Sequence, residues 1–135
     1  MLRDVLVRTL LQCQRQTYNI AVAEWLIQTS GDRVDEYSAL IADHYALAGE
    51  HSEAADWFSQ AGGRALTHGA PKEARLLFDR ALESLPSDDM ERRWRVFLGR
   101  SQALGMLGDY EARLADDEAL LALAREMGDD NRLAE

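Results

Sequence analysis

Three histidines and one acidic run are the side chains whose types could support chemistry. His44, His51 and Glu53 lie close together and are residue types that ligate transition metals. Gly49 interrupts the helix predicted between the two histidines, and no ligand spacing recurs along the chain, so no metal site is expected. His68 stands beside the Gly69 turn, where a cation would favour a helix C-terminus.

The acidic run Asp116, Asp117 and Glu118 could be a cation site or an acid/base pair. On a helix, however, consecutive side chains point in different directions and cannot converge on one atom. We therefore expect a solvated face. The sequence contains no phosphate loop, no GxGxxG, no nucleophile elbow and no HExxH motif, so it predicts neither a catalytic residue nor a cofactor, and the chain is not expected to be an enzyme.

Composition points to a helical protein that binds neither nucleic acid nor anionic membranes. The 135 residues are 47% apolar with a net charge of −9, which is unevenly distributed: residues 31–70 carry −5, residues 71–108 carry +1 and residues 109–135 carry −6, with +1 on residues 1–30. Helix-forming residues dominate, which favours an all-α fold. Charges interrupt residues 1–30, so a signal peptide and a membrane span are excluded and a cytoplasmic location is expected. Cys13 is the sole cysteine and is expected to be a small buried hydrophobe.

Apolar periodicity and turn residues divide the chain into about seven helices. Including the flanking turn residues, these span 2–10, 12–29, 34–48, 52–69, 71–86, 88–108 and 110–128. Ser52 and Asp88 are the expected N-caps, Pro71 suits a first helical turn, and glycines end the helices. Such short connections make consecutive helices antiparallel neighbours, which predicts a helix-hairpin stack.

A seam of small and aromatic residues recurs on two of these helices. One set is Ala54, Phe58, Ala61 and Ala65, and the other is Ala74, Phe78, Ala81 and Leu85. Alternating small and bulky residues at this spacing let two helices pack closely. Gly49 and Gly69 are 20 residues apart, so the helix carrying Phe58 must close one hairpin and open the next.

This pattern resembles tetratricopeptide repeats over about 36–128. The matching positions are Tyr45, Gly49, Ala54, Phe58 and Ala61, then Gly69, Ala74, Phe78, Ala81 and Pro86, then Leu104, Gly108 and Tyr110. Arg113 replaces a small residue of the pattern, and the spacing from Gly69 to Gly108 is 39 residues, so the repeats are degenerate.

The run "LRDVLVRTLLQCQRQTYNIAVAEWL" with the segment "DEYSALIADHYALAGEHSEAADWFSQAGGRAL" resembles a region of bacterial STAND-type signalling ATPases, including multidomain regulators with adenylate/guanylate cyclase or transcription-factor domains. The resemblance implies that 1–33 joins an upstream domain, that 34–128 is a repeat array, and that 129–135 begins a further helix of a longer chain. It also implies a non-catalytic module that contacts a protein, a peptide or neighbouring domains of the parent.

In tetratricopeptide stacks the first helix of each hairpin lines the binding groove. The resemblance thus places a groove at Glu36, Ala39, Asp43, Leu47, Arg95, Leu98, Gln102 and Met106. Ala39 and Asp43 stand where relatives carry carboxylate-clamping Lys and Asn, so a carboxylate clamp is not expected. The alternative is a small-ligand sensor lined by Trp57 and Trp94. Exposed apolar residues Leu2, Val5 and Leu6 also predict a homodimer through terminal helices.

Overall fold

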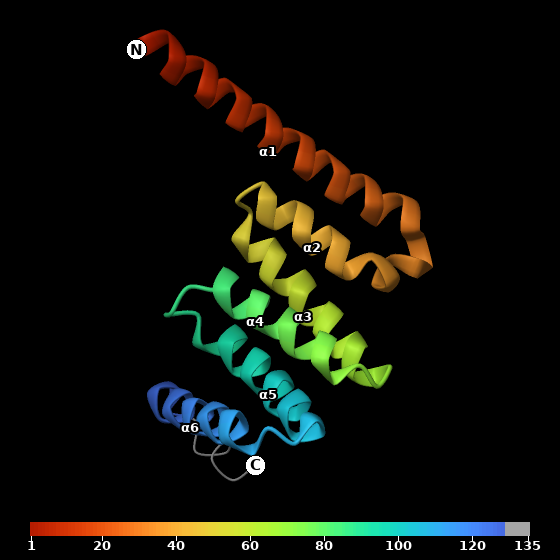
Figure 1. Ribbon diagram of the computed structural model, residues 1–135, viewed down its shortest axis with the longest axis vertical. Helices are drawn as coiled ribbons and strands as arrows, with labels where there is room; N and C mark the ends of the chain where they lie inside the picture. The colour runs from red at the N-terminus through yellow and green to blue at the C-terminus, as the bar shows by residue number, and fades with distance from the viewer. Residues whose placement is uncertain (129–135) are drawn as a thin grey trace.

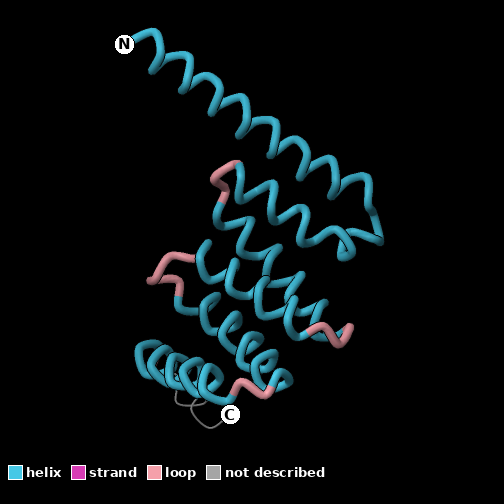
Figure 2. The backbone as a smooth tube through the Cα atoms, in the orientation of Figure 1, coloured by secondary structure: helices cyan, strands magenta, loops and turns pink. Residues whose placement is uncertain are grey.

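The computed structural model describes residues 1–128, and these are almost entirely helical, with no strand among them (Figures 1 and 2). The elements in chain order are α1 (Leu2–Ser30), the 3₁₀-helix η1 (Gly31–Tyr37), α2 (Ser38–Leu47), α3 (His51–Thr67), α4 (Pro71–Ser84), α5 (Met90–Leu107) and α6 (Tyr110–Met127). The predicted all-α class is confirmed. The predicted start of a further helix at 129–135 lies outside the described residues.

The N-terminal region differs from the predicted seven helices. The expected break between 2–10 and 12–29 is absent, and α1 runs without interruption through 29 residues. Leu10, Leu11 and Gln12 are all good helix formers with neither Gly nor Pro among them, so nothing ends the helix there. The third predicted helix begins instead as η1, and the described residues hold six α-helices.

Helices α2 to α6 form a row of antiparallel neighbours (Figure 1). Each consecutive pair in this row packs together, and α1 packs against α2. Helix α3 contacts α2 and α4 and also touches α5. The glycine spacing predicted that the helix carrying Phe58 would serve two hairpins, and α3 has the neighbours that this requires.

The main core follows the predicted seam. Its buried members include both aromatic residues of the seam and the alanines around them: Ala54, Phe58, Ala61, Ala65, Ala74, Phe78 and Ala81. The Phe78 ring lies against two helical glycines, Gly62 and Gly99, whose role the sequence pattern does not indicate. A Cβ added to Gly62 would lie 2.8 Å from the ring, and one added to Gly99 would lie 2.4 Å from it. Phe78 is therefore held between the backbones of α3 and α5.

A second apolar cluster joins α5 to α6 through Trp94, Phe97, Leu120 and Ala124. The small-ligand alternative requires Trp94 to be accessible, but Trp94 is only 8% exposed because this cluster covers it. Cys13 was expected to be buried, and it is exposed because the first half of α1 extends beyond the rest of the structure (Figure 1).

The helix ends are set by glycines and aspartates. Gly49, Gly69, Gly108 and Gly128 have positive φ, which confirms them as helix stops. Asp109 caps α6 by accepting from the Ala112 backbone N–H. The two predicted N-caps are wrong: α3 begins at His51, one residue before Ser52, and the N-cap of α5 is Asp89, one residue beyond Asp88.

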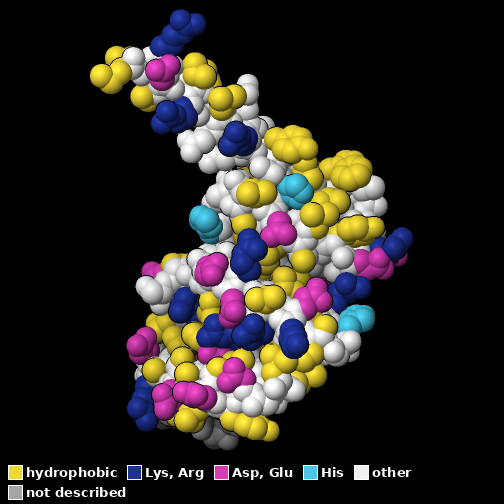
Figure 3. Space-filling view, in the orientation of Figure 1, with side chains coloured by type: hydrophobic (Ala, Val, Ile, Leu, Met, Phe, Trp, Pro, Cys, Tyr) yellow, Lys and Arg dark blue, Asp and Glu magenta, His cyan; other side chains and the backbone are white. Residues whose placement is uncertain are grey.

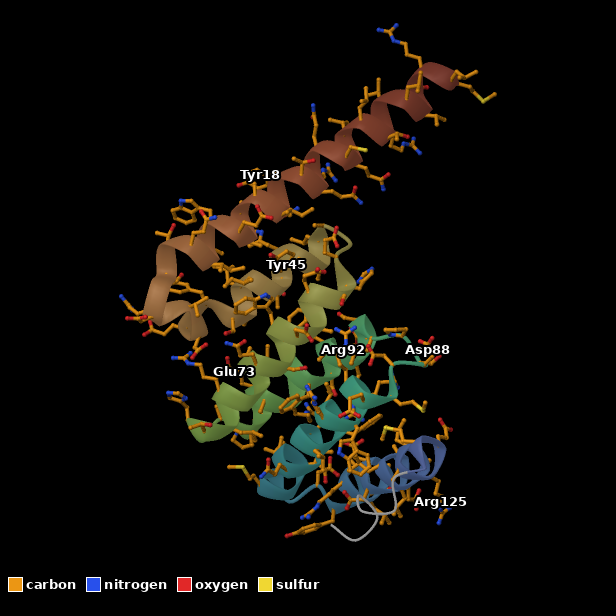
Figure 4. The ribbon with its side chains drawn as sticks, turned by 180° about the vertical axis from the view of Figure 1, so that it is seen from behind. Tyr18, Tyr45, Glu73, Asp88, Arg92 and Arg125 are labelled. Carbon is orange, nitrogen blue, oxygen red and sulfur yellow. The ribbon has the colours of Figure 1, made fainter. Side chains whose placement is uncertain are left out.

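Asp89 is fixed by contacts that Asp88 lacks. Its carboxylate accepts from the Arg92 backbone N–H at 3.3 Å and from Arg92 Nε at 2.6 Å. In Figure 4, Asp88 lies at the outer edge of the turn, away from Arg92. The hydrogen bond from the Arg92 side chain, with the backbone bond and the nearby charge, lowers the pKa of the Asp89 carboxyl.

We expect Asp89→Ala to lower the free energy of unfolding by about 1 kcal/mol, the usual cost of a lost N-cap, and Asp88→Ala to leave it nearly unchanged. Because the folded-state pKa of Asp89 is lowered, its contribution is present above the unfolded-state pKa and is lost as the pH falls through the folded-state value. The difference between wild type and Asp89→Ala should therefore narrow below about pH 4. Urea unfolding across this pH range measures it, and an equal effect of both variants would contradict the cap assignment.

Candidate functional site

A groove runs between α2 and α4, and α3 forms its floor. One wall comes from Asp35 and Glu36 of η1 and Ala39 of α2. The opposite wall comes from Glu73 and Leu77 of α4 (Glu73 is labelled in Figure 4). The floor is made by Ala61 and Ala65 of α3, and Arg64 and the C-cap residue His68 lie at its end. Because the floor residues are alanines, the backbone of α3 lies close to the groove.

An ion pair bridges the two walls further along. Arg80 Nη2 of α4 lies 3.4 Å from Asp43 Oδ1 of α2, and both side chains are about half exposed. The Arg80 guanidinium also lies over the Phe58 ring, 4.6 Å from its centroid. Arg80 is thus held on an aromatic ring of the floor, and it closes the groove at the Asp43 position.

Charges of both signs surround the other end. Arg33 Nη2 donates to Glu36 Oε2 at 2.8 Å, and this hydrogen bond is the main reason that the pKa of Glu36 is lowered, with Arg64 adding a smaller attraction. Gln60 donates to Asp35. A second shallow hollow adjoins the groove here and shares Asp35, Arg64 and His68 with it. This end therefore offers carboxylate acceptors on one wall and a guanidinium on the floor.

The groove is narrow. Its volume is about 120 Å³, whereas pockets for drug-sized ligands usually measure about 300–1,000 Å³. A space of this size accommodates one side chain of a partner rather than a whole metabolite. The geometry is that of a shallow groove with alanines on its floor and charged residues on its rims.

The structure divides the predicted groove residues between two surfaces. Glu36 and Ala39 line the α2–α4 groove, and Asp43 bridges it. Leu47 lies exposed at the end of α2. Arg95 lines a different hollow of about 170 Å³ between α3 and α5, and the remaining predicted residues are exposed on α5: Leu98, Gln102 and Met106.

The reason for this division is the order of the helices. Helix α2 meets α4 across α3, whereas α5 meets α3 across α4. The predicted groove residues near α2 and those on α5 therefore do not line the same groove. The α4 wall, Glu73 and Leu77, was not predicted from the sequence. The 20-residue interval between Gly49 and Gly69 could have predicted it. This interval makes α3 the helix that two hairpins share, so that α4 meets α2 across α3.

His44, one of the residues considered for chemistry, has a structural role in the fold. His44 Nδ1 lies 2.9 Å from Asn19 Oδ1 of α1. Among residues 1–128, no group of three or more His, Cys, Asp and Glu side chains is arranged to hold a metal ion. Trp57 is half-buried against the main core and Trp94 is buried, so neither forms the exposed aromatic lining that a ligand sensor would use.

Asp116 of the acidic run is buried, which corrects the expectation of a solvated face at that residue. Asp116 is only 3% exposed and receives two hydrogen bonds from Arg100, one of them Nε to Oδ2 at 2.8 Å. Arg100 also donates to Asp79 Oδ1 at 2.9 Å, and Ser101 donates to Asp117 at 2.7 Å. Arg100 therefore links α4, α5 and α6. Asp116 and Asp117 thus both bond to partners on α5, whereas Glu118 is exposed.

Comparison with known proteins adds no relative to this picture. No protein-family model, curated protein or solved structure matches the chain. Within residues 1–128, no helix combines the length and the apolar character that a bilayer crossing needs. The function is therefore inferred from the groove and the sequence pattern.

Proposed function

We propose that this chain is a non-catalytic interaction module with a tetratricopeptide-like solenoid fold, and that it binds an extended protein segment in the α2–α4 groove. The observation that carries the proposal is the groove itself, in which an alanine floor lies between two walls carrying acidic side chains, with Arg64 and Arg80 beside them. Extended segments bind such surfaces through side-chain pockets and charged rims.

The repeat pattern supports the solenoid assignment. Tyr45, Ala54 and Phe58 are buried where α2 meets α3, and the equivalent Ala74 and Phe78 are buried where α3 meets α4. Consecutive antiparallel helices in a row are the arrangement that such repeats adopt. The degenerate period agrees with α3 serving both hairpins.

The proposed context is a larger bacterial signalling ATPase of the STAND type, in the cytoplasm. The support is the sequence resemblance of the N-terminal run and of 35–66. In that setting the partner is either another protein or a neighbouring domain of the parent chain. Any ATPase or cyclase chemistry would belong to other parts of that parent.

The test is selection of linear peptides from a display library against the chain, followed by affinity measurement. We expect Ala39→Arg to weaken the selected peptides at least tenfold, because the long side chain fills the groove. Asp43→Lys should also weaken them, because it breaks the bridge to Arg80 and reverses the charge of one wall. Ala122→Arg, at an exposed alanine of α6, is the matched control and should leave affinity unchanged.

Two results would contradict the proposal. One is a selection that yields no peptide binding the folded chain. The other is a set of peptides whose affinity is insensitive to Ala39→Arg and Asp43→Lys but falls with Arg95→Glu, which would move the site to the α3–α5 face.

A further inference from the structure

Helix α1 carries an unpartnered stripe along its whole length. Only its second half packs against the rest of the structure, through Ala23 and Leu26. Every residue from 1 to 18 is exposed, and Figure 3 shows apolar and basic side chains on this overhanging part. Figure 1 shows the overhang standing clear of the helical row.

The exposed stripe follows a seven-residue repeat. One series is Asp4, Leu11, Tyr18 and Trp25, and the other is Val7, Gln14, Ala21 and Gln28. The two series alternate by three and four residues, which is the a/d spacing of a coiled coil. All eight side chains are exposed, whereas Ala23 and Leu26 lie on another face of the same helix. The stripe is thus free while the helix is attached to α2.

We propose that this stripe binds a second copy of the chain, with the two α1 helices antiparallel. In an antiparallel pair, residues whose numbers add to 32 lie opposite one another, and each pair joins one series to the other. These pairs are Asp4 with Gln28, Val7 with Trp25, Leu11 with Ala21, and Gln14 with Tyr18.

Each of these pairs is chemically matched. Val7 meets Trp25 and Leu11 meets Ala21, so apolar groups face apolar groups, and a large side chain faces a small one in the second pair. The Gln28 amide can donate to the Asp4 carboxylate, and Gln14 can bond the Tyr18 hydroxyl. A parallel pair would instead place Asp4 against Asp4 and Trp25 against Trp25. The self-complementarity of the stripe therefore selects the antiparallel arrangement.

A hollow at the end of the stripe fits the same partner. It measures about 210 Å³ and is lined mainly by Trp25, Leu26 and Tyr37, with Thr29, Ser30 and Arg33 at its edge. In the antiparallel register, Val7 of the second copy comes level with Trp25, which lines this hollow. The partner's N-terminal half therefore covers the hollow, and its exposed Val7 loses contact with water.

Sedimentation equilibrium of the full chain tests the association. We expect a dimer whose dissociation constant rises at least tenfold in Leu11→Arg, because a guanidinium replaces an apolar group opposite Ala21. Leu6→Arg is the matched control, since Leu6 is 57% exposed against 50% for Leu11 but lies off the stripe, and it should change the constant much less. Helix content by circular dichroism should be unchanged in both. A wild-type monomer at high concentration, or an equal effect of both variants, would overturn the proposal.

Cross-linking with a short bis-maleimide tests the orientation. In a Cys13→Ser background, Thr17→Cys lies near the two-fold axis and should cross-link, whereas Val7→Cys should not, because its copies are separated by about 27 Å along the helix axis. The double variant Val7→Cys/Trp25→Cys should cross-link again. Efficient cross-linking of Val7→Cys alone would show a parallel pair and overturn the antiparallel arrangement.

Discussion

Replacing Gly99 with alanine is expected to lower the free energy of unfolding by about 2 kcal/mol, although alanine is the better helix former. The added Cβ would lie 2.4 Å from the Phe78 ring, a distance that real contacts do not reach, so the ring or α5 must move. Overpacking of this kind costs about 1–3 kcal/mol. Alanine gains about 1 kcal/mol in helix propensity over glycine. Because the clash is severe, we expect an overpacking cost of about 3 kcal/mol, which leaves the net loss of about 2 kcal/mol.

Gly63 is the matched control for this prediction. It also lies within a helix, but a Cβ there meets nothing within 4 Å. We expect Gly63→Ala to stabilise the protein by up to about 1 kcal/mol through helix propensity alone. Urea unfolding of both variants measures the difference, and a Gly99→Ala variant as stable as Gly63→Ala would show that Phe78 does not pack against α5.

A double-mutant cycle identifies the ring as the cause. In a Phe78→Leu background the smaller side chain leaves room at Gly99, so Gly99→Ala should cost less than it does in wild type. Groups in direct contact show interaction energies of about 0.5–3 kcal/mol. A Gly99→Ala effect that is the same in both backgrounds would place the clash elsewhere.

Replacing Arg100 with methionine is expected to cost about 3 kcal/mol, because it leaves the Asp116 carboxylate buried without its partner. Arg100 is mostly buried, and its hydrogen bond to Asp116 raises the pKa of the guanidinium, so Arg100 stays charged in the folded protein. The same change removes the bond to Asp79 and the contact of the guanidinium with the Phe97 ring, 5.2 Å from its centroid.

Arg95→Met is the control on the same helix. The Arg95 side chain is 71% exposed and lies 3.7 Å from Glu91, an ion pair of the exposed kind that contributes little. We expect its removal to change stability by less than about 0.5 kcal/mol. The double variant Arg100→Met/Asp116→Leu should recover much of the loss, because it removes the unpaired charge. Equal effects of Arg100→Met and Arg95→Met in urea unfolding would contradict a buried network.

Local sequence signals predicted most of the helical framework. Gly49, Gly69 and Gly108 end helices where expected, and Phe58 and Phe78 are buried with the alanines of the seam. These features depend on backbone conformation and on periodicity within one helix, which a sequence displays directly. The break predicted between residues 10 and 12 is absent from α1. The apolar pattern changes face there, but no residue at that point stops a helix.

Contacts between helices were harder to predict. Aspartate usually lies at the protein surface. The sequence does not show that α5 packs against α6 and brings Arg100 within hydrogen-bonding distance of Asp116. Gly62 and Gly99 are helix-weakening residues whose use becomes clear only from the position of the Phe78 ring. The same limit applies to the groove. The wall opposite Ala39 belongs to α4, and the sequence does not show which helix packs beside α3 at that point.

The most direct test of the proposed groove is an NMR titration. A selected peptide is added to the isotope-labelled chain, and the change in chemical shift of each backbone amide is measured. We expect the largest changes on the two walls, at Glu36 to Asp43 and at Glu73 to Arg80, with smaller changes at the α3 floor. Changes confined to the outer face of α5, around Arg95 and Gln102, would contradict it.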